Sequence, residues 1–227
     1  PWEARHACGQ STQQALQQAL ELAKRRDALL KEERIAEATT FADQIETILR
    51  NGNAVDNINA GAHHQLNGLV YQKAERFSDA QRSYRLALSI YADRPAAAAV
   101  KVNTMLSLAG CYAVQEDYAK AEAVLNDIEN INTAPGTADL TRTMVLLIRA
   151  QMYQKQGNAT AAKDLIKELL RKNQSNHQLL ITLLEKAAVI ERDAGDHAAA
   201  ANLYEQLIRL ARSSKPDTAC VSPSQLM

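Results

Sequence analysis

Two pairs of neighbouring side chains in this sequence have the chemistry of metal ligands. His63 and His64 are adjacent, and adjacent side chains on a helix point about 100° apart, so one ion cannot easily bind both. We expect one of them to be a solvated helix residue and the other to be packed. His6 and Cys8 could share a metal with other groups, but two ligands near a chain end do not complete a site. The sequence therefore predicts no metal site.

Carboxylates near the predicted turns are the other groups that could carry acid–base chemistry. Glu116 is next to Asp117, and Glu191 lies close to Asp193. We expect these side chains to be solvated or to cap helices. The sequence contains no phosphate-binding loop, no HExxH and no pair of CxxC motifs. It therefore predicts neither an enzyme nor a cofactor.

The cysteines Cys8, Cys111 and Cys220 are too few and too scattered for a disulfide framework. We interpret Cys111 as an apolar helix residue and the other two as terminal residues. A second interpretation stays open for Cys8, because "ACGQ" resembles a lipoprotein N-terminus although the residues before it are polar.

The composition is typical of an all-α protein. Hydrophobic residues make up 46% of the 227 residues and charged residues 23%, which indicates a folded chain rather than a disordered one. Alanine and leucine are abundant, whereas only 8 glycines and 5 prolines are present. A strand-rich fold would need more turns and more β-branched residues.

The charges exclude a simple electrostatic function. Lysine plus arginine equals aspartate plus glutamate, at 26 each, so the chain has no net charge with which to coat nucleic acid or an anionic membrane. No stretch of 18 uncharged apolar residues predicts a membrane span, and the first ten residues lack the apolar core of a signal peptide. We expect a cytoplasmic protein; export to the periplasm stays open if a signal has been removed.

A repeat of about 40 residues organises the chain. An alanine recurs in one setting, after an acidic or glycine-containing turn and before apolar residues four and seven positions later. The spacings between its copies are 42, 41, 41 and 38 residues. These copies are Ala38, Ala80, Ala121, Ala162 and Ala200.

Each repeat contains two amphipathic segments joined by a short polar turn. In one repeat, the first segment has apolar residues at helical spacing from Leu106 to Ala113, and the second has them from Tyr118 to Ile128. A single helical hairpin cannot bury both apolar stripes, so the hairpins must stack. Small residues such as Ala109 and Ala121 would allow the two helices of a hairpin to approach closely.

These positions resemble the tetratricopeptide repeat family, in an elongated form. The resemblance covers residues 58–213 well and 12–50 weakly, and the opening tryptophan of the family motif is absent. The matching positions are the first-helix small residue (Gly68, Ala109, Ala150 and Ala188), the tyrosine three residues later (Tyr71, Tyr112 and Tyr153, with Glu191 in the last copy), and the second-helix alanines above. The residues in place of the tryptophan are His64, Met105, Leu146 and Leu184.

The resemblance implies a right-handed superhelical solenoid of about five antiparallel helical hairpins. We expect a flexible N-terminus over residues 1–11, a repeat domain over 12–213 and a disordered tail over 214–227. The repeat units would cover 12–50, 57–92, 97–131, 138–172 and 177–213. Helices are predicted near 12–30, 33–50, 57–75, 78–92, 97–115, 118–131, 138–156, 159–172, 177–194 and 197–213, with a helix opening at Pro95. The family also uses the tyrosine position for packing, which favours packing over an aromatic ladder for nucleic acid.

The resemblance further implies a concave groove lined by the first helix of each hairpin. Its side chains mix carboxamides and apolar groups with few charges, which suits a peptide with apolar anchors. The groove positions are Gln65, Leu69, Gln72, Asn103, Leu106, Gly110, Val114, Met144, Leu147, Gln151, Gln154, Lys155, Glu185 and Arg192, with Lys73, Thr182 and Val189 on the same faces.

We therefore predict a non-catalytic scaffold or adaptor that binds a partner protein or peptide in this groove. Two alternatives stay open. The last helix, "HAAAANLYEQLIRLA", could dock another copy of the chain through Leu203, Leu207 and Leu210. The chain could instead be a ligand-sensing or regulatory region of a larger protein.

Overall fold

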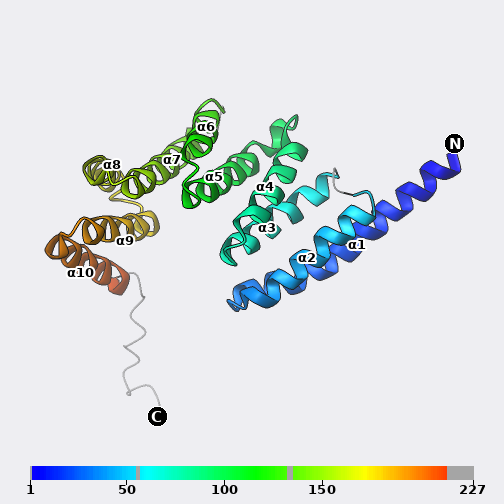
Figure 1. Cartoon of the computed structure of the whole chain (residues 1–227), viewed down its shortest axis with the longest axis horizontal. Helices are drawn as coiled ribbons and strands as arrows, with labels where there is room; N and C mark the ends of the chain where they lie inside the picture. Colours follow the sequence, from blue (N-terminus) through cyan, green and yellow to red (C-terminus); the bar gives the residue numbers. More distant parts are fainter. Residues whose placement is uncertain (1, 55–56, 132–134, 214–227) are drawn as a thin grey trace, which may run out of the picture. The chain divides into compact units, whose positions relative to one another are not determined.

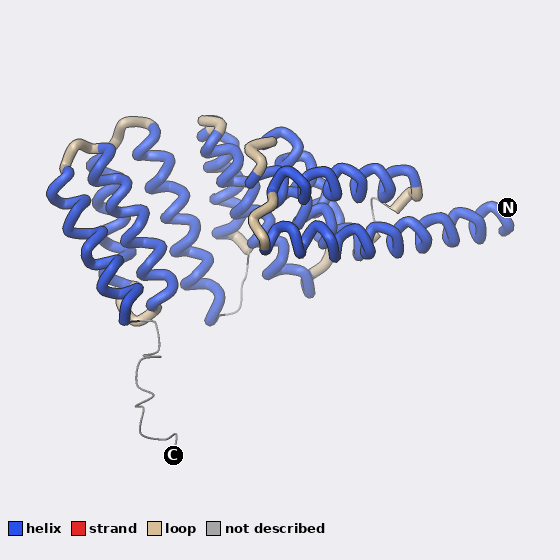
Figure 2. Tube along the Cα trace, turned by 90° about the horizontal axis from the view of Figure 1, so that it is seen from below, coloured by secondary structure: helices blue, strands red, loops and turns tan. Residues whose placement is uncertain are grey.

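The computed structural model describes residues 2–54, 57–131 and 135–213. It divides into two compact units, Pro1–Val145 and Leu146–Met227, which are considered separately below. The described residues form helices and connecting turns, without strands (Figures 1 and 2). The all-α prediction is confirmed.

Three helical hairpins make up most of the first unit. They are α1 (Trp2–Lys31) with α2 (Ile35–Asn51), α3 (Ile58–Lys73) with α4 (Phe77–Tyr91), and α5 (Ala98–Val114) with α6 (Tyr118–Glu129). Neighbouring hairpins pack through α2 against α3 and through α4 against α5. The first helices also contact each other, α1 with α3 and α3 with α5. This is the stacking that the repeat predicted.

The second unit is built from α8 (Ala159–Lys172), α9 (His177–Asp193) and α10 (His197–Ser213), preceded by the end of α7 (Pro135–Lys155). Helix α9 packs against both α8 and α10. The core of the second unit contains the predicted small residues Ala162, Ala188 and Ala200, which are all buried. The boundary between the two units lies inside α7.

The observed helix bounds agree with the predicted ones within a few residues, apart from the start of α1. That helix begins at Trp2 rather than at residue 12, because the residues before Ser11 contain no proline after Pro1 and can extend a helix that is already anchored by packing. Pro95 opens a short 3₁₀ turn (Pro95–Ala97) ahead of α5 instead of the α-helix itself. Helix α7 begins at Pro135, since proline is tolerated in the first turn. The predicted tail over 214–227 lies outside the described residues.

The same turn joins the two helices in all five hairpins. One residue in each turn has a positive φ: Glu33, Glu75, Glu116, Gly157 and Gly195. In the second hairpin, the Arg76 N–H donates to Tyr71 O at 2.8 Å, and equivalent bonds recur at Arg34, Asp117, Asn158 and Asp196. These bonds close the end of each first helix and require a left-handed residue.

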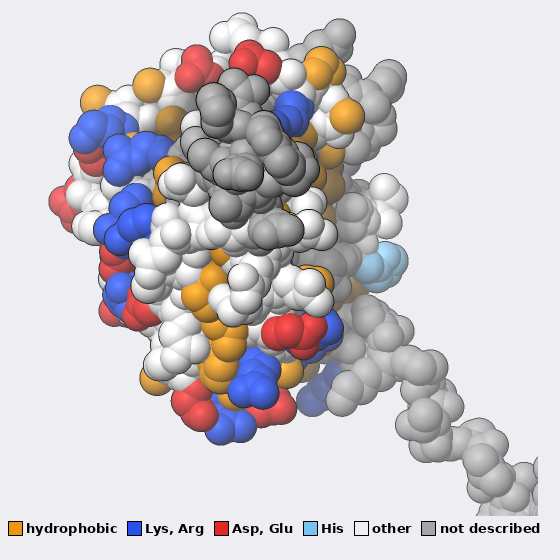
Figure 3. Space-filling model, turned by 90° about the vertical axis from the view of Figure 1, so that its right-hand side faces the viewer, with side chains coloured by type: hydrophobic (Ala, Val, Ile, Leu, Met, Phe, Trp, Pro, Cys, Tyr) orange, Lys and Arg blue, Asp and Glu red, His pale blue; other side chains and the backbone are white. Residues whose placement is uncertain are grey.

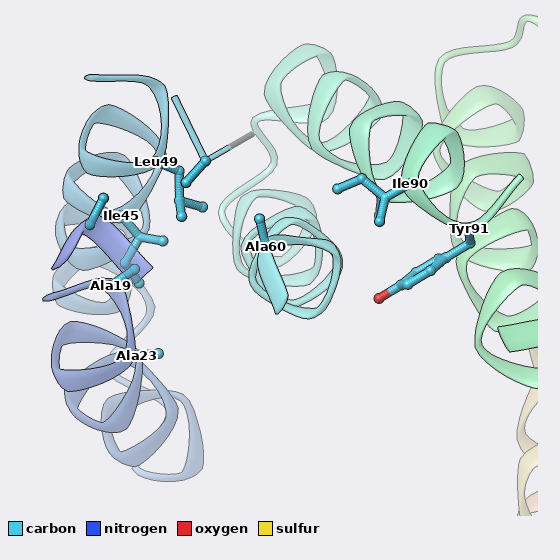
Figure 4. Packing of buried hydrophobic residues seen from close by; sticks show 10 residues of the cluster. Ala19, Ala23, Ile45, Leu49, Ala60, Ile90 and Tyr91 are labelled. Carbon is cyan, nitrogen blue, oxygen red and sulfur yellow. The ribbon is translucent and has the colours of Figure 1, made fainter. Parts of the chain in front are cut away.

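Small residues in the first unit lie where helices approach closely. A Cβ on Gly68 would lie 2.6 Å from the Tyr84 ring, and one on Gly61 would lie 2.9 Å from the Tyr91 ring. An apolar cluster joins the first two hairpins, in which Ala19, Ile45 and Ala60 are fully buried (Figure 4). Close approach of these helices is therefore what the alanines and glycines provide.

One segment, Pro95–Val114, is long and apolar enough to cross a membrane by length and composition. Eight residues of α5 within it are buried, and the helix packs against α4 and α6. A helix in the core of a soluble protein passes the same test, so this segment is weak evidence for a membrane span.

Candidate partner-binding surface

The α3 side of the predicted groove is held in place by the packing layer beneath it. Gln65, Leu69 and Gln72 are half-buried. The Tyr84 hydroxyl donates to Gln72 Oε1 at 2.9 Å, and the Tyr84 ring packs under Gly68. The Gln72 amide is thereby oriented with its N–H₂ group available as a donor.

The α5 side of the groove is the more open one. Asn103 is exposed, Leu106 is half-buried and Val114 is 56% exposed. A Cβ on Gly110 would have no heavy atom within 4 Å. Gly110 therefore differs from Gly68, because the fold does not need a small residue there.

Helices α3 and α5 contact each other, so the two sides of the groove are neighbours. The Tyr84 hydroxyl of α4, which packs against both helices, donates to Gln72 on α3, while the Ser107 hydroxyl on α5 donates to Asn103 O in its own helix. Burial raises the pKa of the Tyr84 phenol, so the hydroxyl stays protonated as a donor. The α3 and α5 groove residues therefore belong to one continuous surface, which we call the α3–α5 face and define by Gln65, Leu69, Gln72, Asn103, Leu106, Gly110 and Val114.

The second unit brings some of the predicted groove residues together through an aspartate. Gln154 Nε2 on α7 donates to Asp193 Oδ2 at 2.6 Å, and Arg192 donates to Asp193 Oδ1. Gln151 is half-buried, whereas Lys155 and Glu185 are exposed. Asp193 was interpreted only as a solvated or capping residue, yet it organises this part of the surface.

Leu147 was predicted to line the groove, but it is buried. Its side chain is 6% exposed and belongs to the buried layer of α7, with Val145 and Ala150. A partner cannot reach it without disturbing the core. Met144, which lies in the first unit, is half-buried.

The two histidines are both buried, so the expectation of one solvated histidine was wrong. His63 is 9% exposed and His64 is fully buried. His64 Nδ1 lies 3.0 Å from Glu46 Oε1, which also accepts from Asn67 Nδ2 at 3.0 Å and Ser83 Oγ at 3.2 Å. These residues are structural, and no group of three metal-binding side chains occurs among the residues that the structure describes.

An arginine completes this buried group. Arg26 on α1 is fully buried, and its Nη1 donates to Asn67 Oδ1 at 2.6 Å. Its Nη2 lies 2.8 Å from Asp27 Oδ1 but without the geometry of a hydrogen bond. The residues Arg26, Glu46, His64, Asn67 and Ser83 are called the buried polar cluster from here on. They join four helices of the first two hairpins.

The repeated tyrosines pack, with one exception. Tyr71 is buried and donates to Asp43 Oδ1 at 2.9 Å, while the Arg76 guanidinium lies 4.7 Å from its ring centroid. Tyr112 is also buried, but Tyr153 is 37% exposed. Tyr71 thus packs between hairpins, and because Tyr112 is buried as well, neither ring is available to stack on bases.

The carboxylates near the turns differ in role: one caps a helix, as expected, and another forms a largely buried ion pair. Asp117 caps α6, since its side chain accepts from the Lys120 N–H, as predicted. Glu191 was expected to be solvated or capping, but its side chain is only 13% exposed and pairs with Lys163 of α8. Glu191 occupies the position of the repeated tyrosine, which explains its burial.

The remaining candidate groups are the leucines of α10 and the thiol of Cys111. Leu203, Leu207 and Leu210 on α10 are half-buried, and Ile208 of the same helix is an exposed large hydrophobic residue, at 48%. Cys111 is buried, and burial raises the pKa of its thiol to about 12. Basic and acidic side chains are interspersed on the face shown in Figure 3, with hydrophobic side chains between them.

Comparison with known proteins places this fold. No protein-family model matches the chain, and no curated protein matches it. Solved structures, however, are similar to this chain. The apo quorum sensor NprR from B. thuringiensis has a TM-score of 0.69 and 17% identity over 88% of this chain, which spans 56% of the NprR chain.

Two further solved structures match this chain over nearly their whole length. The TPR-like repeats of a putative kinesin light chain from Podospora anserina have a TM-score of 0.59 and 16% identity, over 88% of this chain and 99% of that one. BtubC from P. vanneervenii has a TM-score of 0.55 and 17% identity, over 98% and 96%. The chain therefore has a tetratricopeptide-type helical repeat fold, as its sequence pattern predicted.

Proposed function

We propose that this protein is a non-catalytic scaffold that binds a peptide segment of a partner protein on the α3–α5 face. The observation that carries the proposal is the composition of that face. Carboxamides (Gln65, Gln72 and Asn103) alternate with half-buried or exposed leucine and valine side chains. Carboxamides can donate to and accept from a peptide backbone, and the apolar groups can contact side chains.

The open position at Gly110 supports a ligand that approaches the α5 backbone. A glycine inside a helix costs about 1 kcal/mol relative to alanine, and here no neighbouring atom requires it. Close approach of a bound segment gives this glycine a role. The low charge of the face favours a partner segment that is itself largely uncharged at its anchors.

A bulky residue at Gly110 tests the proposal directly. Gly110→Arg should block the face without disturbing the core, because nothing lies within 4 Å of the added Cβ. Ala123→Arg is the matched control, since Ala123 is exposed on α6. We expect affinity capture from a native extract to lose a partner with Gly110→Arg and to keep it with Ala123→Arg, while both variants show unchanged helical circular dichroism.

Two results would contradict this function. Capture of the same protein by wild type and Gly110→Arg would move the binding site away from the α3–α5 face. Retention of only the chain itself, with a mass that rises with concentration, would instead favour self-assembly through α10.

A further inference from the structure

The second unit contains a cleft that the predicted groove does not include. It lies between α8, α9 and α10 and has a volume of about 230 Å³. Its lining includes the apolar residues Ile166, Ala187 and Ile190, with Lys167 and Glu191 among its polar residues. This volume is below the range of pockets for drug-sized ligands, and it is suited to a single side chain.

The repeat alignment explains why the cleft exists. Glu191 occupies the position of Tyr71 and Tyr112 in the two inter-hairpin interfaces of the first unit. Ala187, one residue before the small residue Ala188, occupies the position of Asn67 and Leu108. Both positions therefore have shorter side chains in the last interface than in the earlier two.

The first interface shows what normally fills this space. Tyr71 is 1% exposed there, and its hydroxyl reaches Asp43 on the second helix of the preceding hairpin. Asn67 joins the buried polar cluster in the same interface. In the second unit, Lys167 occupies the repeat position of Asp43, five residues after the second-helix alanine. The residue at the tyrosine position is Glu191 there, so that position places no aromatic ring beside Lys167.

The charges around the cleft indicate what it would accept. Lys163 is paired with Glu191, whereas Lys167 forms no ion pair within the described part of the chain. The charged residues of the lining thus have a net charge of one positive unit. An acidic group beside the bound side chain would be attracted to Lys167, and ammonium groups near the cleft favour an aromatic ring over an aliphatic side chain.

We propose that this cleft binds a phenylalanine side chain of a partner peptide in which acidic residues flank the phenylalanine. The ring takes the space that Tyr71 and Tyr112 fill in the earlier interfaces, so a partner supplies in trans what the repeat otherwise supplies itself. A phenylalanine is preferred because the ring enters from outside and its far edge contacts Ile166, Ala187 and Ile190. This site is separate from the α3–α5 face.

A methyl NMR titration of the full chain tests the cleft. The probe is the peptide N-acetyl-Glu-Phe-Glu-amide, and the signals followed are the methyl groups of Ile166, Ala187, Ile190 and Ala199, which line the cleft. We expect these signals to shift with an affinity about 10- to 100-fold greater than for N-acetyl-Glu-Ala-Glu-amide, because burial of the ring supplies the difference. N-acetyl-Lys-Phe-Lys-amide should bind more weakly than the acidic peptide and should lose less affinity when salt is added.

Filling the cleft provides the matched variants. Glu191→Tyr restores the residue of the earlier repeats, and Ala187→Leu restores the residue found at Leu108. Each should reduce the affinity for the phenylalanine peptide at least about tenfold, by occupying the space of the ring. Two variants are used so that a folding defect in one leaves the other informative.

Several results would overturn the proposal. These are the absence of shifts at these methyl groups, equal binding of the alanine peptide, or undiminished binding by both filled variants. Shifts that depend on protein concentration alone would show a second copy in the cleft, and shifts on removal of residues 214–227 would show the chain's own tail there; either would also overturn it.

Discussion

Glu46 on α2 and His64 on α3 are hydrogen-bonded at 3.0 Å between side chains that are almost completely buried. A carboxylate only accepts hydrogen bonds, so His64 is the donor in this pair, through Nδ1–H. His64 occupies the position at which the tetratricopeptide motif has its opening tryptophan. Polar pairing thus replaces aromatic packing at the junction of the first two hairpins.

Replacing Glu46 by glutamine should destabilise the first unit. All three bonds from His64, Asn67 and Ser83 go to the same oxygen, Glu46 Oε1, and a glutamine oxygen can take its place but lacks the negative charge that strengthens them. We expect a loss of about 1–3 kcal/mol in the free energy of unfolding, measured by urea denaturation. Glu185→Gln, at an exposed position, is the control and should change stability by less than about 0.5 kcal/mol. Equal effects of the two variants would contradict the structural role of the cluster.

Acidification should destabilise the first unit in two ranges. Burial lowers the pKa of His63 below its usual 6.5, with Arg26 and His64 adding to the shift, so the stability that neutral His63 contributes is present above pH 6.5 and is lost as the pH falls through the lowered value. Burial alone would raise the pKa of Glu46, but hydrogen bonds and charge from His64, with hydrogen bonds from Asn67 and Ser83, hold it below 4.5. Its contribution is therefore lost at still lower pH.

Thermal unfolding followed by circular dichroism measures this dependence. Between about pH 7.5 and about pH 5, the decrease in Tm should be smaller for His63→Gln than for wild type, because the variant has no imidazole to protonate. Below that range Glu46→Gln should show the smaller decrease. An identical pH dependence in all three proteins would show that neither group titrates with folding.

Two glycines in consecutive hairpins should respond oppositely to alanine. Gly68→Ala places a Cβ 2.6 Å from the buried Tyr84 ring, which cannot move aside, and should cost about 1–3 kcal/mol. Gly110→Ala meets no atom within 4 Å and should stabilise the helix by about 0.5–1 kcal/mol. Chemical denaturation of the two variants tests both signs together. A destabilised Gly110→Ala would show that this position is more crowded than the structure indicates.

The recurrent turn gives a second pair of opposite effects. Gly195 has a φ of +83°, and Gly195→Ala should cost about 1–2 kcal/mol because a Cβ is unfavourable in that region. Glu75 has a φ of +59°, so Glu75→Gly should stabilise by about 0.5–1 kcal/mol, once the greater flexibility of glycine in the unfolded chain is counted. The measurement is the Tm of each variant, and a stabilising Gly195→Ala would argue against the left-handed turn.

The sequence predicted the helices well because each has a clear apolar period and a small residue in a repeated register. Ala121 and Tyr71 are buried as expected, and the helix bounds differ by few residues apart from the start of α1. It predicted individual surface residues less well. Leu147 is buried because helix α7 has core side chains on more than one stripe, which a single family register does not show.

The buried polar cluster could not be predicted from the sequence. Its members come from four helices, and Arg26 and Asn67 are 41 residues apart, so no local pattern connects them. A charged residue in an amphipathic helix is usually interpreted as solvated. The Glu191 cleft had a visible signal, since the tyrosine changes to glutamate in the repeat alignment, but the lost volume is evident only in the packed structure.

The buried polar cluster also limits how this chain can be shortened. A chain beginning at residue 57 would retain α3 and α4 intact, yet His64 and Asn67 would lose the partners that Arg26 and Glu46 provide. The apolar residues Ala60, Ile90 and Tyr91 would lose the cover of the first hairpin at the same time. A stable fragment that contains α3 and α4 is therefore expected to need the first hairpin as well, although its repeat motif is the weakest.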